Sequence, residues 1–245
     1  MVHVTADCLD ERNPSPMKTL RYVFVAASLP LVLSLAACED PAKDKPKATV
    51  EAPKTEAKAP GSAAPAATPA PVAAAPAKME ALDVDAAGST IGFIGSKVTG
   101  KHEGKFEKFT GKITLADGKA EGGSMNFEVE TATAKTDAAD LDKHLQKADF
   151  FDVEKFPKAT FVSTAIKAGG EKGATHMVTG DLDLRGVKKS ITFPVTITIT
   201  PDAATGTAEF SINRKDFGIV IEGKKDDLIR DDVLLKISLK APRKK

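Results

Sequence analysis

The chain has 245 residues, of which 42% are hydrophobic, 28% charged and 5% aromatic, with a formal net charge of +1. This charge balance argues against nucleic-acid binding through phosphate contacts, and the length allows one large domain or two small ones. From Cys38 to Met79 there is no aromatic residue and Pro and Ala dominate, so that stretch contributes little to a packed core. What remains is one domain of roughly 160 residues, a usual domain size.

The N-terminal region has the pattern of a secretory signal. Met17–Arg21 is short and basic, and Tyr22–Ala36 is apolar but shorter than the about 20 residues that a membrane-spanning helix needs. Cys38 follows Leu-Ala-Ala, which resembles the bacterial lipobox and implies cleavage before Cys38 and its acylation with chains such as palmitate. The alternative is an ordinary signal peptide with a chance cysteine. We therefore expect residues 1–37 to be an upstream segment and a lipoprotein signal peptide, with Met17 as the true start, since acidic residues precede it.

Residues 38–79 are predicted to be a disordered, Pro/Ala-rich tether, because so few large apolar side chains cannot offset the entropy lost on ordering. In an extended polyproline conformation of about 3.1 Å per residue, such a segment would reach on the order of 100 Å. We expect it to hold the domain away from a membrane. The acidic residues after Cys38 do not decide between the inner and the outer membrane.

Residues 80–245 alternate between apolar and polar side chains, as half-buried antiparallel strands do. The clearest run is Val187–Thr200, in which Ile191, Phe193 and Val195 share one face; Pro194, on the other face, indicates an edge, a bend or a bulge. Similar runs cover 90–98, 112–115, 124–131, 160–168, 176–184, 207–212 and 233–239. With a short strand near 82–85, the pattern predicts eight to ten strands in an antiparallel barrel or sandwich.

One segment has helical rather than strand periodicity. Between Asp137 and Ala148, Leu141, His144, Leu145 and Ala148 fall on one stripe. The sequence therefore predicts a helix here, with Thr136 or Asp137 as its cap and with His144 packed against the domain.

The domain carries no signature of catalysis. It contains no cysteine, no GxSxG motif and no cluster with metal-ligand spacing, so we expect no disulfide, metal site, cofactor or enzymatic activity. Asp226-Asp227 and Asp231-Asp232 flank Arg230 in what reads as a solvated loop.

The interior positions are apolar and rich in Phe, with neither Trp nor Tyr in the domain. Such a lumen would suit a long hydrocarbon better than a sugar or a nucleotide. The candidate lumen residues are Phe93, Phe127, Phe161, Phe193 and Phe210. Periodicity alone does not separate lumen lining from ordinary core.

Three cationic or ionisable side chains in turns are candidates to contact a ligand head group. His102 lies in a turn between strands, Arg185 precedes a Gly between two strands, and Arg214 follows Asn213 at a strand end. Either guanidinium suits a phosphate or carboxylate, and each can equally pin a turn by pairing with a nearby Asp.

Five motifs in order resemble those of the YceI-like family of secreted lipocalin-like barrels. They are His102 with Gly104, Phe106, Phe109 and Gly111; His144-Leu145 with Asp149–Pro157; Ala159–Thr164; Gly180–Lys189; and Ile212–Gly218. The resemblance covers residues 82–241 and implies an eight-stranded antiparallel barrel with a helical insertion, whose apolar lumen binds polyisoprenoids or similar amphiphilic lipids.

Together these features predict an all-β, lipid-anchored protein of the bacterial cell envelope that faces the periplasm and binds an isoprenoid or fatty-acyl lipid in its lumen. Two alternatives remain open: a structural or interaction module whose barrel is filled by its own side chains, and an enzyme acting on a lipid or quinone. The sequence identifies neither the lipid, the membrane, the biological process nor the oligomeric state.

Overall fold

The structure is a computed structural model that describes residues 40–53, 77–221, 223–224 and 227–243. The expected signal peptide and Cys38 lie outside these residues, as does the middle of the expected tether, so both expectations stay predictions. In the part of the chain that the structure describes, no helix has the length and apolar character needed to cross a membrane.

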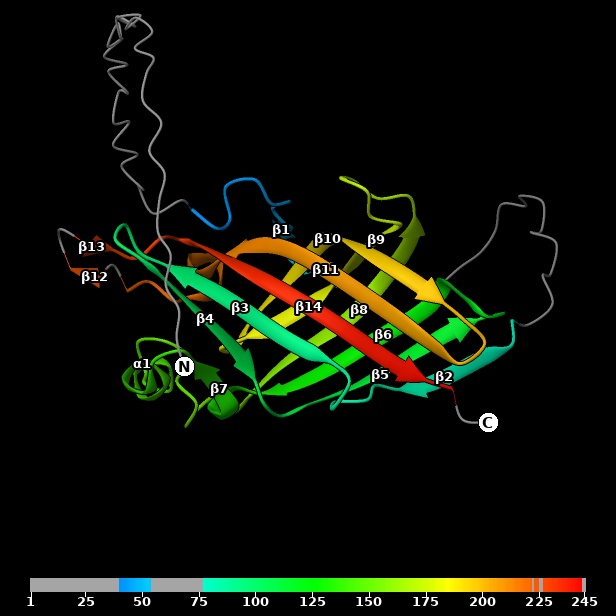
Figure 1. Cartoon of the computed structure of the whole chain (residues 1–245), viewed down its shortest axis with the longest axis horizontal. Coiled ribbons are helices and arrows are strands. Elements are labelled where there is room, and N and C mark those ends of the chain that lie inside the picture. The colour runs from blue at the N-terminus through cyan, green and yellow to red at the C-terminus, as the bar shows by residue number, and fades with distance from the viewer. Residues whose placement is uncertain (1–39, 54–76, 222, 225–226, 244–245) are drawn as a thin grey trace, which may run out of the picture. The chain divides into compact units, whose positions relative to one another are not determined.

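The described chain forms a curled, 12-stranded antiparallel sheet, ordered β2-β5-β6-β8-β9-β10-β11-β14-β3-β4-β7 with β1 attached to β10 (Figure 1). The strands are β1 (Thr49–Glu51), β2 (Met79–Asp83), β3 (Thr90–Ser96), β4 (Lys101–Phe106), β5 (Phe109–Ala116), β6 (Lys119–Glu130), β7 (Ala134–Thr136), β8 (Lys158–Ala168), β9 (His176–Leu184), β10 (Val187–Ile199), β11 (Ala203–Asn213) and β14 (Asp232–Pro242). A separate short hairpin consists of β12 (Gly223–Lys224) and β13 (Asp227–Leu228).

This architecture confirms the predicted all-β, antiparallel, lipocalin-like barrel. The strand count exceeds eight because short strands such as β1 and β7 add to the long ones. Near the end of β14, the backbone N–H of Asp85 donates to the carbonyl of Lys240 (2.8 Å) and Arg243 pairs with Glu80 (3.0 Å). These contacts hold the β2 side of the curled sheet against β14.

Strand β10 changes its partner halfway, which opens a gap in the wall. It pairs with β9 from Val187 to Val195 and with β11 from Thr196 to Ile199, so Pro194 lies next to the point where the partner changes. This placement fits the bend expected from the missing N–H of proline. From Val195 back to Val187, β10 does not pair with β11, so the two strands leave a gap between their facing edges.

Residues 46–51 occupy this gap, which corrects the expectation that all of residues 38–79 form a disordered tether. The backbone of Ser211 in β11 donates to Pro46 and accepts from Ala48, each at 2.9 Å. On the other side, β1 pairs with Ser190–Thr192 of β10. The segment therefore completes the wall, because it satisfies backbone groups on both strand edges that would otherwise be unpaired.

The predicted helix is present but shorter than expected, as α1 (Ala139–Leu145). Its N-cap residue is Ala138, which makes no side-chain capping bond, so the expected cap by Thr136 or Asp137 is wrong. Thr136 instead donates through its N–H (2.6 Å) and its hydroxyl (2.7 Å) to the carboxylate of Asp142, inside the helix. These bonds lower the pKa of Asp142 and fasten α1 to the end of β7.

The helix packs with its apolar side on the barrel, as the stripe predicts. Leu145 is buried and Leu141 packs on the same cluster as Phe93, Phe106 and Phe151. The expected packing of His144 is only partial, because the ring lies edge-on to Phe150 while Nε2 is 2.9 Å from a carboxylate oxygen of the half-exposed Asp149.

Candidate functional site: an apolar cavity in the barrel

A cavity of about 240 Å³ lies inside the barrel. Among the described residues that line it, the only polar side chains are those of Thr160, Arg214 and Arg230. The rest are aliphatic, aromatic, Met or Gly, contributed by β3, β4, β6, β8–β11, β14 and the segments around α1 and β13. Such a wall offers burial to a hydrocarbon and few partners for a polar ligand.

Small residues on the inner face of β11 leave this space open. Gly206, Ala208 and Phe210 of β11 all line the cavity. The first two are small, whereas Phe210 is large. A Cβ placed on Gly206 would have only one neighbour, a Val195 methyl group at 3.9 Å, and one on Gly95 of β3 would have nothing within 4 Å. Both glycines therefore face space that a larger side chain would fill.

The five Phe residues predicted from periodicity, Phe93, Phe127, Phe161, Phe193 and Phe210, all line the cavity. Phe193 and Phe210 stack at a centroid distance of 4.1 Å, and Phe161 lies 5.6 Å from Phe193. Sequence reasoning missed Phe106, Phe150 and Phe151, which line the cavity beneath α1. The period-two signal did not reach Phe150 and Phe151, because they follow the helix in a turn.

Three of these rings lie against glycines of neighbouring strands. A Cβ on Gly104 would come within 2.5 Å of the Phe93 ring, and one on Gly180 within 2.5 Å of the Phe161 ring. Gly111 stands in the same relation to Phe127, its direct partner across β5 and β6. Because these positions lack a Cβ, each ring covers the sheet instead of crossing the lumen. The motif glycines thus keep the cavity open.

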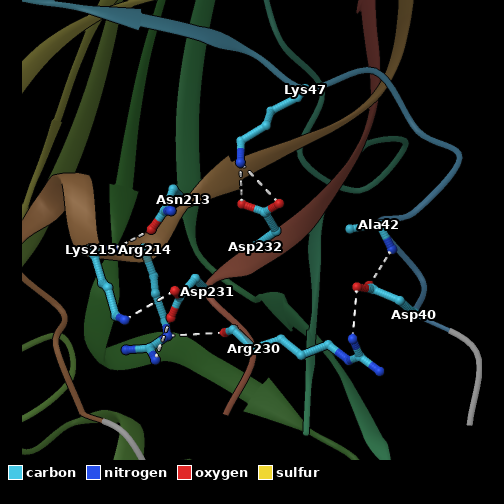
Figure 2. Close-up of polar contacts among 9 residues, drawn as sticks. All are labelled: Asp40, Ala42, Lys47, Asn213, Arg214, Lys215, Arg230, Asp231 and Asp232. Carbon is cyan, nitrogen blue, oxygen red and sulfur yellow. Dashed lines mark hydrogen bonds and ion pairs between the residues drawn. The ribbon is translucent and has the colours of Figure 1, made fainter. Parts of the chain in front are cut away.

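Arg214 reaches the cavity wall, but its guanidinium serves the fold. The residue is 4% exposed, and its nitrogens donate to the carbonyls of Ile219 (2.7 Å), Arg230 (3.0 Å) and Ile229 (3.2 Å). A further bond reaches the carboxylate of Asp231 (3.1 Å), which Figure 2 shows. With its donors committed to these partners, Arg214 holds the loop before β14 and has little left for a ligand.

The other two predicted head-group residues lie outside the cavity lining. His102 is on β4, with Nδ1 2.8 Å from the carboxylate of Asp137. Arg185, in the β9–β10 turn with φ of +56°, donates to the carbonyls of Gly218 and Ala148. Both side chains pin neighbouring segments, so the structure favours the turn-stabilising role that the sequence left open for Arg185.

Arg230 is the cation that sequence reasoning missed. It lines the cavity, its side chain is 33% exposed, and Nη1 lies 3.1 Å from the carboxylate of Asp40 (Figure 2). Its Nε is buried and has no hydrogen-bond partner among the described residues. A partly exposed guanidinium with unused donor capacity therefore borders the cavity. No local signal marked this residue, because Asp40 lies 190 positions away.

The opposite end of the barrel is packed. There the remaining void is about 20 Å³, between residues that include Ile113, Leu115, Ala120, Ile166 and Ala204. The cavity is thus bordered by packed side chains at one end, and its lining includes the partly exposed Arg230. Among the described residues, no group of acidic, His or Cys side chains has the arrangement of a metal site.

Comparison with known proteins identifies relatives of this barrel. A UPF0312 protein of Pseudomonas putida strain W619 is 41% identical over 122 residues, which are 47% of this chain and 62% of that protein. A UPF0312 protein of Pseudomonas syringae pv. tomato is 45% identical over 93 residues, 38% of this chain and 47% of that protein. The match thus spans less than two thirds of these relatives.

Two solved structures share the fold. Burkholderia cenocepacia BcnA is 29% identical with a TM-score of 0.59, and the match covers 64% of this chain and 99% of BcnA. A polyisoprenoid binding domain from Saccharophagus degradans has a TM-score of 0.53 over 66% of this chain and 98% of that domain; at 17% identity it shows the fold alone.

A family model described as the YceI-like domain matches residues 82–241. This range runs from β2 to the end of β14 and includes the whole cavity wall. The motif resemblance is therefore confirmed, and the chain belongs to the YceI-like family.

Proposed function

We propose that the barrel binds the hydrocarbon chain of a polyisoprenoid or a similar long-chain amphiphilic lipid. The observation that carries this proposal is the apolar cavity, which borders packed side chains at one end and includes the partly exposed Arg230 in its lining. The fold of the Saccharophagus degradans domain, which binds polyisoprenoids, supports it.

Burial alone supplies enough free energy for binding without any catalytic group. Each methylene moved from water into such a cavity contributes about 0.8 kcal/mol, or roughly a fourfold change in Kd. Affinity should therefore rise with chain length until the cavity is filled. A polar head group would remain outside the apolar wall, near Arg230.

The same proposal includes a membrane anchor. The lipobox-like Leu-Ala-Ala-Cys sequence favours cleavage before Cys38 and its acylation. Acylation would place the barrel on the periplasmic side of a bacterial inner or outer membrane. An anchored barrel would hold or present its lipid locally instead of carrying it across the periplasm.

Native mass spectrometry of the protein purified without detergent tests the lipid-binding part. We expect a co-purifying lipid, or uptake of added octaprenol with 1:1 stoichiometry. Uptake should weaken as the prenyl chain is shortened. If no lipid co-purifies and the protein takes up no added octaprenol, lipid binding is refuted. That result would favour the alternative of an interaction module. Turnover of the bound lipid would instead indicate an enzyme.

A further inference from the structure

We propose that the end of the barrel that carries Arg230 lies against the membrane, so that the cavity exchanges its lipid directly with the bilayer. This inference rests on the acylation of Cys38 proposed above. It goes beyond it, because it assigns a membrane-docking surface and an orientation to the barrel.

The first step is that the segment following Cys38 is fixed to the barrel. Asp40 pairs with Arg230 at 3.1 Å and accepts a bond from the N–H of Ala42, which is 7% exposed (Figure 2). Lys45 then pairs with Glu209 and Lys47 with Asp232, each at 2.7 Å. These side-chain contacts add to the backbone pairing of residues 46–51 with β10 and β11. The segment is part of the barrel wall.

The second step is the short distance that remains between the anchor and the barrel. Cys38 precedes Asp40 by two residues, so their Cα atoms lie at most about 7 Å apart. An acyl chain on Cys38 would therefore enter the bilayer beside Arg230. Any longer stalk would have to precede Asp40, because β1 and β2 are both paired with barrel strands.

The third step is the surface around this point. Val98, Val220 and Leu228 have exposed fractions of 53%, 63% and 47%. The backbone N–H of Val98 donates to the carbonyl of Leu228 (3.2 Å), and Val220 follows Ile219, whose carbonyl binds Arg214. Figure 1 shows the β12–β13 hairpin, which carries Leu228, at the same end of the barrel as the β3–β4 turn, which carries Val98. Exposed apolar side chains gathered in one region are typical of surfaces that insert into the membrane interface.

The fourth step is the path of the ligand. Ile219, Ile229 and Arg230 line the cavity, and in the chain Ile219 is next to Val220 and Ile229 is next to Leu228. A lipid that leaves the bilayer at this point would enter the cavity without crossing water. The cationic Arg230 would then lie at the level of the phosphate groups, where a guanidinium is favourable.

A depth measurement on the acylated full-length protein tests this orientation. The domain has no native cysteine, so Leu228→Cys and Val162→Cys each introduce one label site; Val162, on β8, is a matched control because its exposed fraction is 48%. Each variant is labelled with an environment-sensitive fluorophore and reconstituted into vesicles of phosphatidylethanolamine and phosphatidylglycerol that contain spin-labelled lipid. We expect strong quenching at position 228 and little at position 162.

Equal quenching at the two positions would overturn the inference, and so would a mass of the mature protein without acyl chains. Quenching at position 228 in a protein that takes up no lipid would support the orientation while refuting lipid binding. Normal lipid uptake with an unquenched label at position 228 would support lipid binding and refute the orientation.

A second variant lengthens the short connection between Cys38 and the barrel without changing any residue of the barrel. A flexible Gly/Ser linker of about 20 residues inserted between Cys38 and Glu39 would have an average end-to-end distance on the order of 25 Å. We expect at least about tenfold slower transfer of a fluorescent prenyl lipid from the vesicles to the protein. An unchanged transfer rate would contradict direct exchange at the membrane surface.

Discussion

The two ends of the barrel are built from the same period-two pattern, yet one is packed and the other is hollow. At the packed end, Ile113, Leu115 and Ile166 leave a void of about 20 Å³. Toward the hollow end, Gly95 and Ala208 line a cavity of about 240 Å³. Alternation of apolar and polar residues decides which side chains face inward, and their sizes decide whether the interior is filled.

The two ends also differ in what closes them. The packed end is held by apolar contacts and by the Arg243–Glu80 pair at 3.0 Å. The hollow end is bounded by α1, by the loop that Arg214 holds, and by the Asp40–Arg230 pair. Polar contacts therefore surround the region through which a ligand would pass, and side-chain packing secures the rest.

Filling the cavity should have the largest effect of any change considered. Gly206→Phe adds a ring to the cavity wall, and its Cβ has room, since a Cβ there is 3.9 Å from its only close neighbour. If the ring displaces about four methylenes of the ligand, the loss is about 3 kcal/mol, or more than about 100-fold in Kd. Native mass spectrometry with octaprenol measures this loss.

Thr207→Phe is the matched control, because Thr207 is the next residue of β11 and is exposed on the outer face. It should leave uptake unchanged. Thermal unfolding of both variants confirms that they fold. Undiminished uptake by a folded Gly206→Phe protein would mean that the cavity is not the binding site.

The sequence predicted the strands and the inward Phe residues because both follow from local alternation. It did not predict β1, because the residues from Pro46 to Glu51 contain only Ala48 and Val50 as apolar members among charged and polar neighbours. Their pairing depends on the edges of β10 and β11, which come together only in the folded chain. Ser190 and Ser211 are accordingly buried although they read as outward-facing.

The roles of Arg214 and Arg230 could not be predicted from the sequence either. Arg214 and Arg230 are each followed by an acidic residue one or two positions on, and nothing local distinguishes them. Three backbone carbonyls occupy Arg214, whereas Arg230 faces Asp40 from the start of the described chain. Which cation remains available to a ligand is decided by contacts between distant segments.

Truncating one isoleucine at each end compares the contribution of packing to stability. Ile113, at the packed end, and Ile191, on the cavity wall, are 4% and 2% exposed. We expect Ile113→Ala to lower the free energy of unfolding by about 3–4 kcal/mol, within the usual range for a core Ile. Ile191→Ala should cost about 2 kcal/mol, since a side chain beside a void has fewer contacts to lose. Urea denaturation measures both, and equal losses would argue that the cavity closes in solution.

Removing the cation at the hollow end should have a smaller and more selective effect. Arg230→Gln should weaken binding of a polyprenyl phosphate by about tenfold, or about 1.4 kcal/mol, while leaving a neutral polyprenol unaffected. Asp40→Asn should strengthen phosphate binding, because it removes the carboxylate that competes for Arg230. Arg243→Gln, at the packed end, is the control and should change neither. Equal effects on both lipids would rule out a head-group role for Arg230.

The smallest effect concerns the polar bonds that fasten α1 over the hollow end. The pKa of Asp142 is lowered below its ordinary value of 3.8, chiefly by the hydrogen bonds from Thr136. A carboxylate with a lowered pKa in the folded state adds stability above its unfolded pKa, and this contribution is lost as the pH falls through the folded value. The melting temperature of Asp142→Asn should therefore lie below that of the wild type at pH 7.

Below about pH 4, that difference should shrink, because the unfolded wild-type chain then binds a proton at Asp142 more readily than the folded chain does. Asp140→Asn is the matched control: Asp140 lies on the same helix but is fully exposed, and its substitution should leave the profile unchanged. A difference between Asp142→Asn and the wild type that stays constant from pH 3 to about pH 7 would show that the charge of Asp142 does not hold the helix. The attachment of α1 would then depend on apolar contacts such as those of Leu145 and Phe151, and this part of the hollow end would resemble the packed end more closely than its polar contacts suggest.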